Sequence, residues 1–493
     1  AIGQTMGIHR VAVDVDLQHA KARFLAGVGD ADDLAFEDAV RERWLGQRQG
    51  LLTRAHRPLV VPDRWRRRQG ALLFDRLATK LAAVSFEGRI HERCACGSSF
   101  ASHERLADSG SRFVLRGTDR VYERPRPFRI HHIDLELDLD HPGKALEGTA
   151  CLWFERVSNE AKQLRLDAVA FEVEAVQLGR LRGAKRPKKV SYRATDYVYD
   201  GDTLIVTVPA SVQRGVVRVK YRATPRRGMY FLAPDEAVPT RPSQIWTQCQ
   251  DEDARHIFPC HDKPHIKQTM TTRVTAPKGW FVLSNGDLKS SRKDQRAGHF
   301  RYVMDEPLPS YLFTVVAGTF ACVEESVGEL PVTYYVPPER EADALRTFGK
   351  TPAMIRLFAK LTGVAYPWSK YAQVVVSDFI FGGMENTGAT TMYEHILVDE
   401  RAALDIDSDD LIAHELGHQW FGDLVTCRDW SHAWLNEGFA TYLEHVWRLH
   451  DKGEDEYEQG LRVDLNAYLS EADGSYTRPV VCQDYEAPID IFD

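Results

Sequence analysis

Two histidines four residues apart, with a glutamate directly after the first, are the residues of this chain best suited to chemistry. They stand in "HELGH", where His414, Glu415 and His418 follow "DSDDLIA" (407–413). Ser408 or a neighbouring aspartate can cap a helix that begins there, because small polar side chains accept hydrogen bonds from the free N–H groups of a helix start. Residues four apart share one face of a helix, so both imidazoles can bind one zinc ion while Glu415 acts as a general base. The spacing predicts a catalytic metal centre.

A catalytic zinc site needs a third protein ligand and keeps a fourth position open. Glu437 lies in a second helical stretch, "WLNEGFATYLEHVW" (434–447), after a connection long enough for a turn and a return helix. We therefore predict one zinc ion per chain, bound by His414, His418 and Glu437. We interpret the other nearby histidines as packing or surface residues: His432, His445 and His450.

Paired glycines precede a carboxylate in "FGGMENTG" (381–388), directly after the strand-like "AQVVVSDFI" (372–380). One interpretation is a plain turn at the end of a strand. The other is an edge of backbone that approaches a ligand closely, with Glu385 directed into a cleft. The zinc motif downstream favours the second interpretation.

The hydrophobic period changes along the chain. Residues 1–120 show helical spacing at 30–52 and at the basic stretch 63–84, whose arginines indicate a solvated face more than a membrane-binding one. The cysteines and histidines of "HERCACGSSFASH" (91–103) do not have the spacing of a structural zinc site, so we expect a turn with buried thiols.

A period of two, typical of half-buried strands, begins at 129–140. Similar segments follow at 147–157, 203–210, 215–223 and 310–320. Few helices of crossover length separate them, which predicts an antiparallel sheet domain over 121–320. Helical spacing returns at 339–363 and ends on Gly363, a residue type common at helix ends.

The bulk properties are those of an ordinary soluble protein of several domains. The chain has 493 residues, 43% hydrophobic and 27% charged. Its net charge of -8 argues against a nucleic-acid partner, and no apolar run is long enough for a transmembrane segment. The eight scattered cysteines and the lack of a signal-peptide pattern make a cytoplasmic location the default expectation.

Three motifs in order, "GGMEN" (382–386), "HELGH" (414–418) and "LNEGFA" (435–440), resemble the aminopeptidase N and leukotriene hydrolase family of zinc metallopeptidases, the gluzincins. The resemblance covers about 124–493 and leaves the role of residues 1–120 open. It implies that Gly382, Gly383 and Glu385 bind the free α-amino group of a peptide. The segment "TQCQDEDARHIFPCHDKP" (247–264) is similar to the one by which the family's sheet domain adds to this amine site, which assigns Gln250 to it.

The resemblance also implies an α+β multidomain fold. We expect a helix-rich extension over 1–120, an antiparallel, saddle-like β domain over 121–320 and a thermolysin-like α/β catalytic domain over 321–493. The family uses a tyrosine hydroxyl to stabilise the oxyanion of the reaction. Tyr485 is a candidate, but it lies too close to Glu437 for the usual spacing. We therefore expect that tyrosine beyond residue 493, a catalytic domain incomplete at its C-terminal end, and weak turnover by this piece alone.

The predicted function is that of a zinc-dependent aminopeptidase, a metalloprotease whose substrates are peptides with a free N-terminus. Zinc acidifies water and polarises the peptide carbonyl, while Glu415 takes the proton and returns it to the leaving amine. An amine anchor at Glu385 and Gln250 would confine cleavage to the first peptide bond. Two alternatives remain: an endopeptidase or epoxide hydrolase on the same fold, and a non-catalytic interaction module.

Overall fold

The computed structural model describes residues 113–114, 118–181, 183, 186–187 and 189–492. The helices expected at 30–52 and 63–84, and the segment 91–103, lie outside these residues. Apart from residues 361–363, the described residues belong to one compact unit. Among the helices that the structure describes, none is long and apolar enough to cross a membrane.

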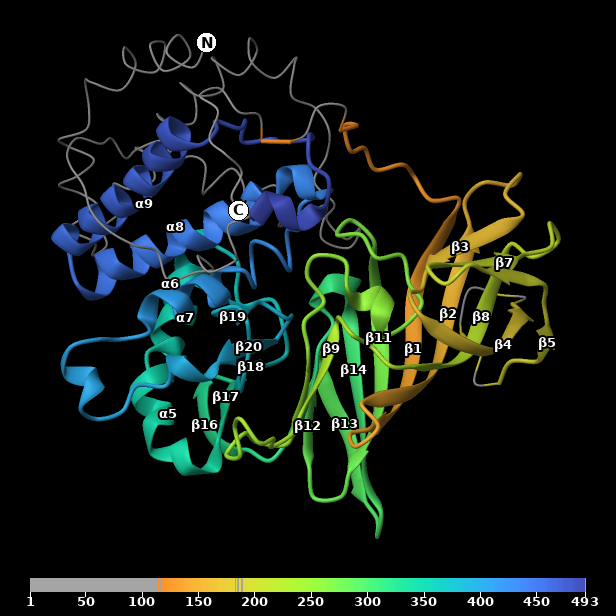
Figure 1. Cartoon of the computed structure of the whole chain (residues 1–493), viewed down its shortest axis with the longest axis horizontal. Helices are drawn as coiled ribbons and strands as arrows, with labels where there is room; N and C mark the ends of the chain where they lie inside the picture. Colours follow the sequence, from red (N-terminus) through yellow and green to blue (C-terminus); the bar gives the residue numbers. More distant parts are fainter. Residues whose placement is uncertain (1–112, 115–117, 182, 184–185, 188, 493) are drawn as a thin grey trace. The chain divides into compact units, whose positions relative to one another are not determined.

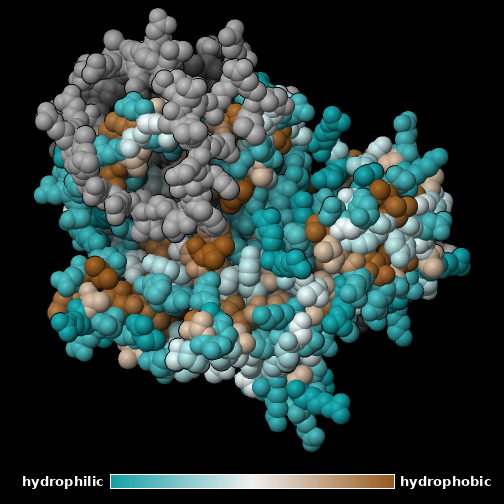
Figure 2. Space-filling view, in the orientation of Figure 1, coloured by the Kyte–Doolittle hydropathy of each residue, from teal (hydrophilic) through white to brown (hydrophobic). Residues whose placement is uncertain are grey.

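An eight-stranded sheet occupies much of the first part of the described chain (orange to green in Figure 1). In order of hydrogen bonding its strands are β13 (Asp287–Lys293), β14 (Ala297–Pro309), β11 (Lys267–Pro277), β1 (Phe128–Asp140), β2 (Ala145–Arg156), β8 (Arg214–Ala223), β4 (Phe171–Arg180) and β5 (Tyr192–Ala194). Along most of β1, buried apolar residues alternate with exposed polar ones, as the period of two predicted. In Figure 2, the surface over this sheet is mostly hydrophilic on the side that faces the viewer.

Each neighbouring pair of this sheet is antiparallel except one. Strands β1 and β11 run parallel, with Ile133 opposite Met270 and Leu137 opposite Val274. The expectation of a wholly antiparallel sheet is wrong for this pair. Alternation within a strand reports which face is buried but not which distant strand lies beside it, so the sequence pattern could not show the parallel pairing.

Two smaller sheets accompany the large one. The first contains β12 (Phe281–Ser284), β15 (Val315–Gly318), β10 (Gln244–Thr247) and β9 (Met229–Leu232). The second contains β3 (Gln163–Asp167), β7 (Thr203–Thr207) and β6 (Tyr197–Tyr199). The strand expected over 310–320 is shorter than predicted, because a 3-10 helix, η2 (Ser310–Leu312), precedes β15.

A five-stranded mixed sheet follows. Its order is β16 (Ala321–Val327), β17 (Leu330–Val336), β18 (Tyr371–Val376), β20 (Ala389–Tyr393) and β19 (Gly383–Met384). All six residues of β18 are buried, as is usual for a central strand with parallel neighbours. Within the described residues, the short strand β19 is at the edge of the sheet and pairs only with β20. This edge carries the paired glycines and Glu385.

The helical pattern over 339–363 forms two helices, α5 (Glu341–Phe348) and α6 (Thr351–Thr362), rather than one. The break falls at Gly349, and Pro352 follows in the first turn of α6. Proline has no N–H to donate to the preceding turn, so it is accepted at a helix start and not inside a continuous helix.

Three helices complete the described chain: α7 (Asp409–Gly417), α8 (Trp434–Asp451) and α9 (Glu454–Gly474), drawn in blue in Figure 1. Ser408 is at the N-cap position of α7, but its hydroxyl donates to the carbonyl of Ile396 (2.6 Å) and does not cap the helix. The carboxylate of Asp407 instead accepts the N–H of Asp409 (3.2 Å). The helix ends at Gly417, earlier than the sequence pattern indicated.

A half-buried lysine joins the large sheet to the loop that follows α7. Lys267, on β11, donates from Nζ to the carbonyls of Asp423 (2.6 Å) and Leu424 (3.2 Å). Burial lowers the pKa of Lys267 to about 8. The strand thus holds the segment directly downstream of His418.

Lys267→Met should lower the free energy of unfolding by about 1–3 kcal/mol, since it removes the donor to the buried carbonyl of Leu424 and one of the two donors to that of Asp423 within the described chain. The midpoint of urea unfolding measures the effect. Lys293→Met, at the exposed end of β13, is the control and should change the midpoint little. An equal midpoint for wild type and Lys267→Met would contradict the role assigned to this lysine.

Candidate functional site

The structure brings His414, His418 and Glu437 together in one cluster. The two Nε2 atoms are 3.0 Å apart, and Oε2 of Glu437 lies 3.4 Å from that of His414 and 3.3 Å from that of His418. Ligands at about 2.0–2.1 Å from a tetrahedral zinc ion are about 3.3 Å from one another. The three donor atoms therefore have the spacing of three corners of a zinc tetrahedron.

Hydrogen bonds on the far side of each ring direct both Nε2 atoms toward this point. Nδ1 of His414 lies 2.6 Å from Oε1 of Glu444, and Nδ1 of His418 lies 2.9 Å from the carbonyl oxygen of Phe421. A carbonyl oxygen only accepts, so Nδ1 of His418 must carry the proton. The Nε2 lone pair of that ring is then available to a metal.

Glu415 lies beside the cluster on α7 and is buried. Among the described residues, its Oε2 atom has no hydrogen-bond partner. A Cβ atom placed on Gly383 would lie 2.3 Å from Oε1 of Glu415. Any side chain at position 383 would clash with Glu415. Glycine there allows strand β19 to lie directly against this glutamate.

Glu385 and Gln250 also present polar atoms without partners. Oε1 of Glu385 and Nε2 of Gln250 are buried, and neither has a hydrogen-bond partner in the part of the chain that the structure describes. Unsatisfied buried polar groups are costly and indicate an absent ligand or water. Gly382 is at the start of the same edge, where its carbonyl accepts the N–H of Tyr393 (3.1 Å) and a Cβ would meet Leu411 at 3.2 Å.

The charges of the protein alone give the cluster an unusual electrostatic state. Burial by itself would lower the pKa of His418, but the carboxylates of Glu437 and Glu385 outweigh it and raise that pKa to about 9. Burial raises the pKa of Glu415 to about 8 and also raises that of Glu385. Burial would raise the pKa of Glu437 as well, but the two imidazoles hold it well below its ordinary value. The cluster thus favours positive charge at its centre.

These observations fit a zinc ion. The donor set is two imidazoles and one carboxylate, the spacing is tetrahedral, and an excess of carboxylates surrounds the centre. The residues that could hold the ion are the three that the sequence predicted, His414, His418 and Glu437.

Two contributing residues were missed at the sequence level. Glu444, which accepts from His414, lies seven residues after Glu437 and hence on the same face of α8, a signal that helical spacing could have supplied. Gln419 donates from Nε2 to the carbonyl of Glu385 (2.9 Å) and accepts the N–H of Gly388 at Oε1 (2.9 Å). No spacing rule indicates such a link between helix and sheet.

The remaining candidates lie elsewhere. Burial raises the pKa of Tyr485, and the nearby carboxylates of Asp429, Glu252 and Glu123 raise it further. This environment favours a structural tyrosine. His445 is buried and pairs with Asp464 on α9 (2.6 Å), in keeping with its interpretation as a packing residue.

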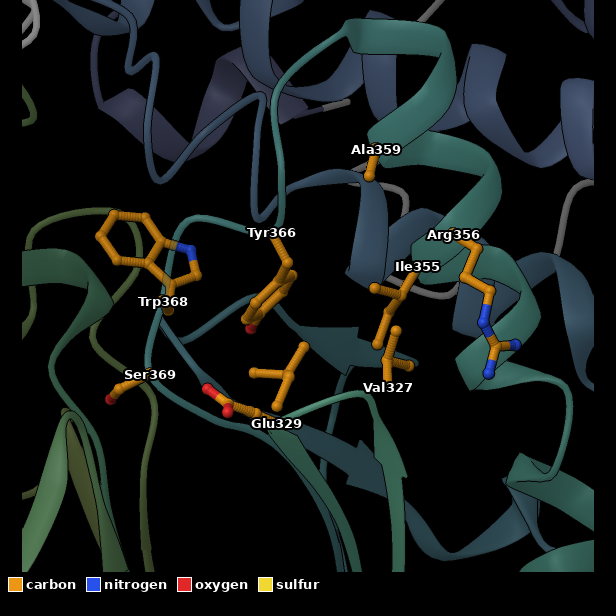
Figure 3. Close-up of a pocket in the computed structure, with 9 residues that line it drawn as sticks. Val327, Glu329, Ile355, Arg356, Ala359, Tyr366, Trp368 and Ser369 are labelled. Atoms are coloured by element: carbon orange, nitrogen blue, oxygen red, sulfur yellow. The ribbon is translucent and has the colours of Figure 1, made fainter.

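A cavity of about 560 Å³ lies apart from these residues (Figure 3). Ile355 and Arg356 of α6, the β16–β17 turn and the segment with Tyr366 and Trp368 line it. None of the predicted site residues is in its wall. Its connection to the site is indirect: the hydroxyl of Tyr366 donates to Gln419 (3.1 Å).

A mixed sheet whose edge strand lies against a helix with an H-E-x-x-H motif, whose two imidazoles and Glu437 could hold a metal ion, is typical of a metallopeptidase. Residues 129–312 match the Peptidase M1 N-terminal domain, and residues 346–493 match the Peptidase family M1 domain. The chain belongs to peptidase family M1. The predicted family and the α+β fold class are confirmed.

Known relatives cover part of the chain. Aminopeptidase B from Homo sapiens is 31% identical over 327 residues, 64% of this chain and 49% of that protein. Leukotriene A-4 hydrolase from Xenopus laevis is 28% identical over 333 residues, 66% of this chain and 52% of that protein. The chain spans about half the length of the curated relatives that it matches.

A solved structure shares the fold. The M1 zinc metallopeptidase from Deinococcus radiodurans is 25% identical, with a TM-score of 0.58 over 75% of this chain and 80% of that one.

Glu444→Gln should weaken zinc binding about 10- to 100-fold, because an imidazole ligand loses the carboxylate that orients it. Competition with a chromophoric chelator measures the affinity. Asp464→Asn is a matched control, since it changes the carboxylate partner of His445, which faces no metal. Equal losses in the two variants would mean that the effect is on the helices and not on the ligand.

Proposed function

We propose that residues 121–493 carry the active site of a zinc-dependent aminopeptidase that removes the N-terminal residue of peptides. The observation that carries this proposal is the pairing of two features. A three-donor cluster has zinc spacing, and the neighbouring Glu385 is buried with an unpartnered acceptor atom, Oε1. The division into domains at 121 and 321, one zinc ion per chain and a cytoplasmic location belong to the same proposal.

His414, His418 and Glu437 hold the ion in this proposal. Zinc at such a site acidifies water and polarises a carbonyl group. Glu415 is the general base: it accepts a proton from the attacking water and delivers it to the leaving amine. Burial raises the pKa of Glu415 to about 8 in the metal-free protein, and the same burial keeps bulk water away from this carboxylate.

The N-terminal ammonium group of the substrate would pair with Glu385. The carboxylate is buried, so an ammonium ion there would form a charge-assisted hydrogen bond in a site of low dielectric constant. Gln250 would hydrogen-bond the same group through its amide oxygen, Oε1, because its unpartnered Nε2 atom is a donor, as is the ammonium group. Because Glu385 is held to Gln419, the neighbour of His418, the distance from the ammonium to the metal is nearly constant.

The free edge of β19 suits an extended peptide. Strand β19 is two residues long and pairs with β20 on one side. A substrate backbone can add to the other side as a further strand, which places its first carbonyl beside Glu415 and leaves side chains to contact the walls.

The endopeptidase alternative uses the same metal ligands and the same base. It does not require an amine anchor, whereas the buried, unpartnered carboxylate of Glu385 favours one. A non-catalytic module would not need a buried glutamate with a raised pKa, such as Glu415, beside three donor atoms that could hold a metal.

Glu415→Gln should keep zinc near one ion per chain and lower peptide hydrolysis about 10²–10⁴-fold, because the base is lost and the ligands are kept. Metal analysis and an aminoacyl fluorogenic amide measure the two effects. His418→Ala should lose the metal first. Loss of zinc from Glu415→Gln would show a structural glutamate and remove the base from the proposal.

Glu385→Gln should raise KM for peptides with a free N-terminus, because the ion pair with the ammonium group is lost. Gln250→Ala should act in the same direction but more weakly, since it removes a neutral hydrogen bond. Rates on matched free and N-acetylated peptides provide the measurement. Cleavage of both peptides at equal rates by the wild type would favour the endopeptidase alternative.

A further inference from the structure

A single, largely covered glutamate, Glu252, connects the segment of Gln250 to the segment that leads into the helix of Glu437. Glu252 follows Gln250 by two positions, and its side chain is 11% exposed. Its Oε1 atom accepts from the indole nitrogen of Trp430 (3.1 Å) and from Nζ of Lys263 (2.8 Å). Its Oε2 atom accepts from Nη2 of Arg255 (2.5 Å). Two of these partners belong to the same segment as Glu252, and the third, Trp430, belongs to the catalytic part.

Trp430 begins the 3-10 helix η6 (Trp430–His432), which leads directly into α8. Its ring is buried and packs edge-on against Tyr311, with centroids 5.2 Å apart. The hydroxyl of Tyr311 accepts from Nδ2 of Asn436 (3.1 Å), and Asn436 directly precedes Glu437. The indole N–H of Trp430 is thus held by Glu252, and its ring packs against Tyr311, which is hydrogen-bonded to Asn436 in the first turn of α8.

Glu437 depends on such support more than the other two metal donors do. Each imidazole has its own orienting partner, Glu444 for His414 and Phe421 for His418. Within the described residues, the polar partners of the Glu437 carboxylate are those two imidazoles. Glu437 is also in the first turn of α8, where its N–H donates to the carbonyl of the N-cap residue Ala433 (3.0 Å). Its place is therefore set by where α8 begins.

We propose that Glu252 is a positioning residue for the metal centre, acting through Trp430 on the start of α8 and so on Glu437. Because Glu252 and Gln250 share one segment, the same contact fixes the amine anchor of the sheet relative to the third metal donor. This inference rests on the proposed function, since it assumes that the cluster binds zinc.

The test measures zinc retention, which does not require turnover. Trp430→Phe keeps the ring and removes only the indole N–H, and Glu252→Ala removes the acceptor. Both variants should release zinc to a chelator about tenfold faster than the wild type, as expected when an outer contact of a metal site is lost. Glu252→Gln retains an oxygen acceptor for the indole and should restore retention to within about threefold of wild type.

Glu123→Gln is the matched control. Glu123 accepts from the same Lys263 (2.9 Å) and its side chain is also 11% exposed, but it does not contact Trp430. The control should lower the melting temperature of the metal-free protein by an amount similar to Glu252→Gln and leave zinc release unchanged.

The outcomes separate the two proposals. A wild-type protein that binds no zinc would refute the proposed function itself. A wild type that binds zinc, together with Trp430→Phe and Glu252→Ala that release it at the wild-type rate, would overturn the positioning role alone. If Glu252→Ala does not fold, Trp430→Phe decides, because it conserves the buried ring. Faster zinc release from Glu123→Gln as well would also overturn the positioning role of Glu252, since the effect would then come from the ion pairs of Lys263 and not from the contact with Trp430.

Discussion

Buried negative charge around two imidazoles is the constraint on which the rest of the site depends. Glu385, Glu415 and Glu444 are buried near His414 and His418, and Glu437 completes the group. Carboxylates removed from water are costly unless positive charge compensates them. From the protein's charges alone the imidazoles would take up protons, as the raised pKa of His418 indicates. A divalent cation satisfies the same requirement, and because both Nδ1 atoms are already hydrogen-bonded, it can be bound only at the Nε2 side.

The short helix α7 keeps this geometry because its other end is fixed. Asp409, in its first turn, accepts from Lys350 (2.7 Å) and from the indole of Trp447 (3.2 Å), and Asp410 pairs with Arg448. Trp447 and Arg448 belong to α8, so α7 and α8 are joined at one end by one hydrogen bond and one ion pair, away from the proposed metal donors. An isolated helix of nine residues would not be stable in water, and these tertiary contacts supply what its own hydrogen bonds cannot.

The parts of the site that follow from local periodicity could be predicted from the sequence. His414 and His418 are one helical turn apart, and Glu437 was accessible because a return helix fits the intervening chain. Pro352 could have indicated the break between α5 and α6, but the apolar spacing across it suggested one helix. The contacts of Gln419 and Glu252 could not be predicted, since each joins residues far apart in the chain through a single hydrogen bond. The parallel pairing of β1 with β11 has the same origin: alternation identifies a strand and not its neighbour.

The hydrogen bonds of Gln419 have a consequence for how selectivity could change. This side chain holds the carbonyl of Glu385, the N–H of Gly388 and the hydroxyl of Tyr366, and it directly follows His418. In the proposed enzyme, Gln419 therefore fixes the distance between the carboxylate that receives the ammonium group and the imidazole that binds the metal. This fixed distance determines which peptide bond lies at the metal, and it does not depend on the identity of the first side chain. The position of the cut and the choice of residue become separable traits: substitutions in the surrounding walls can change which residue is removed, while the number removed in each turnover stays at one.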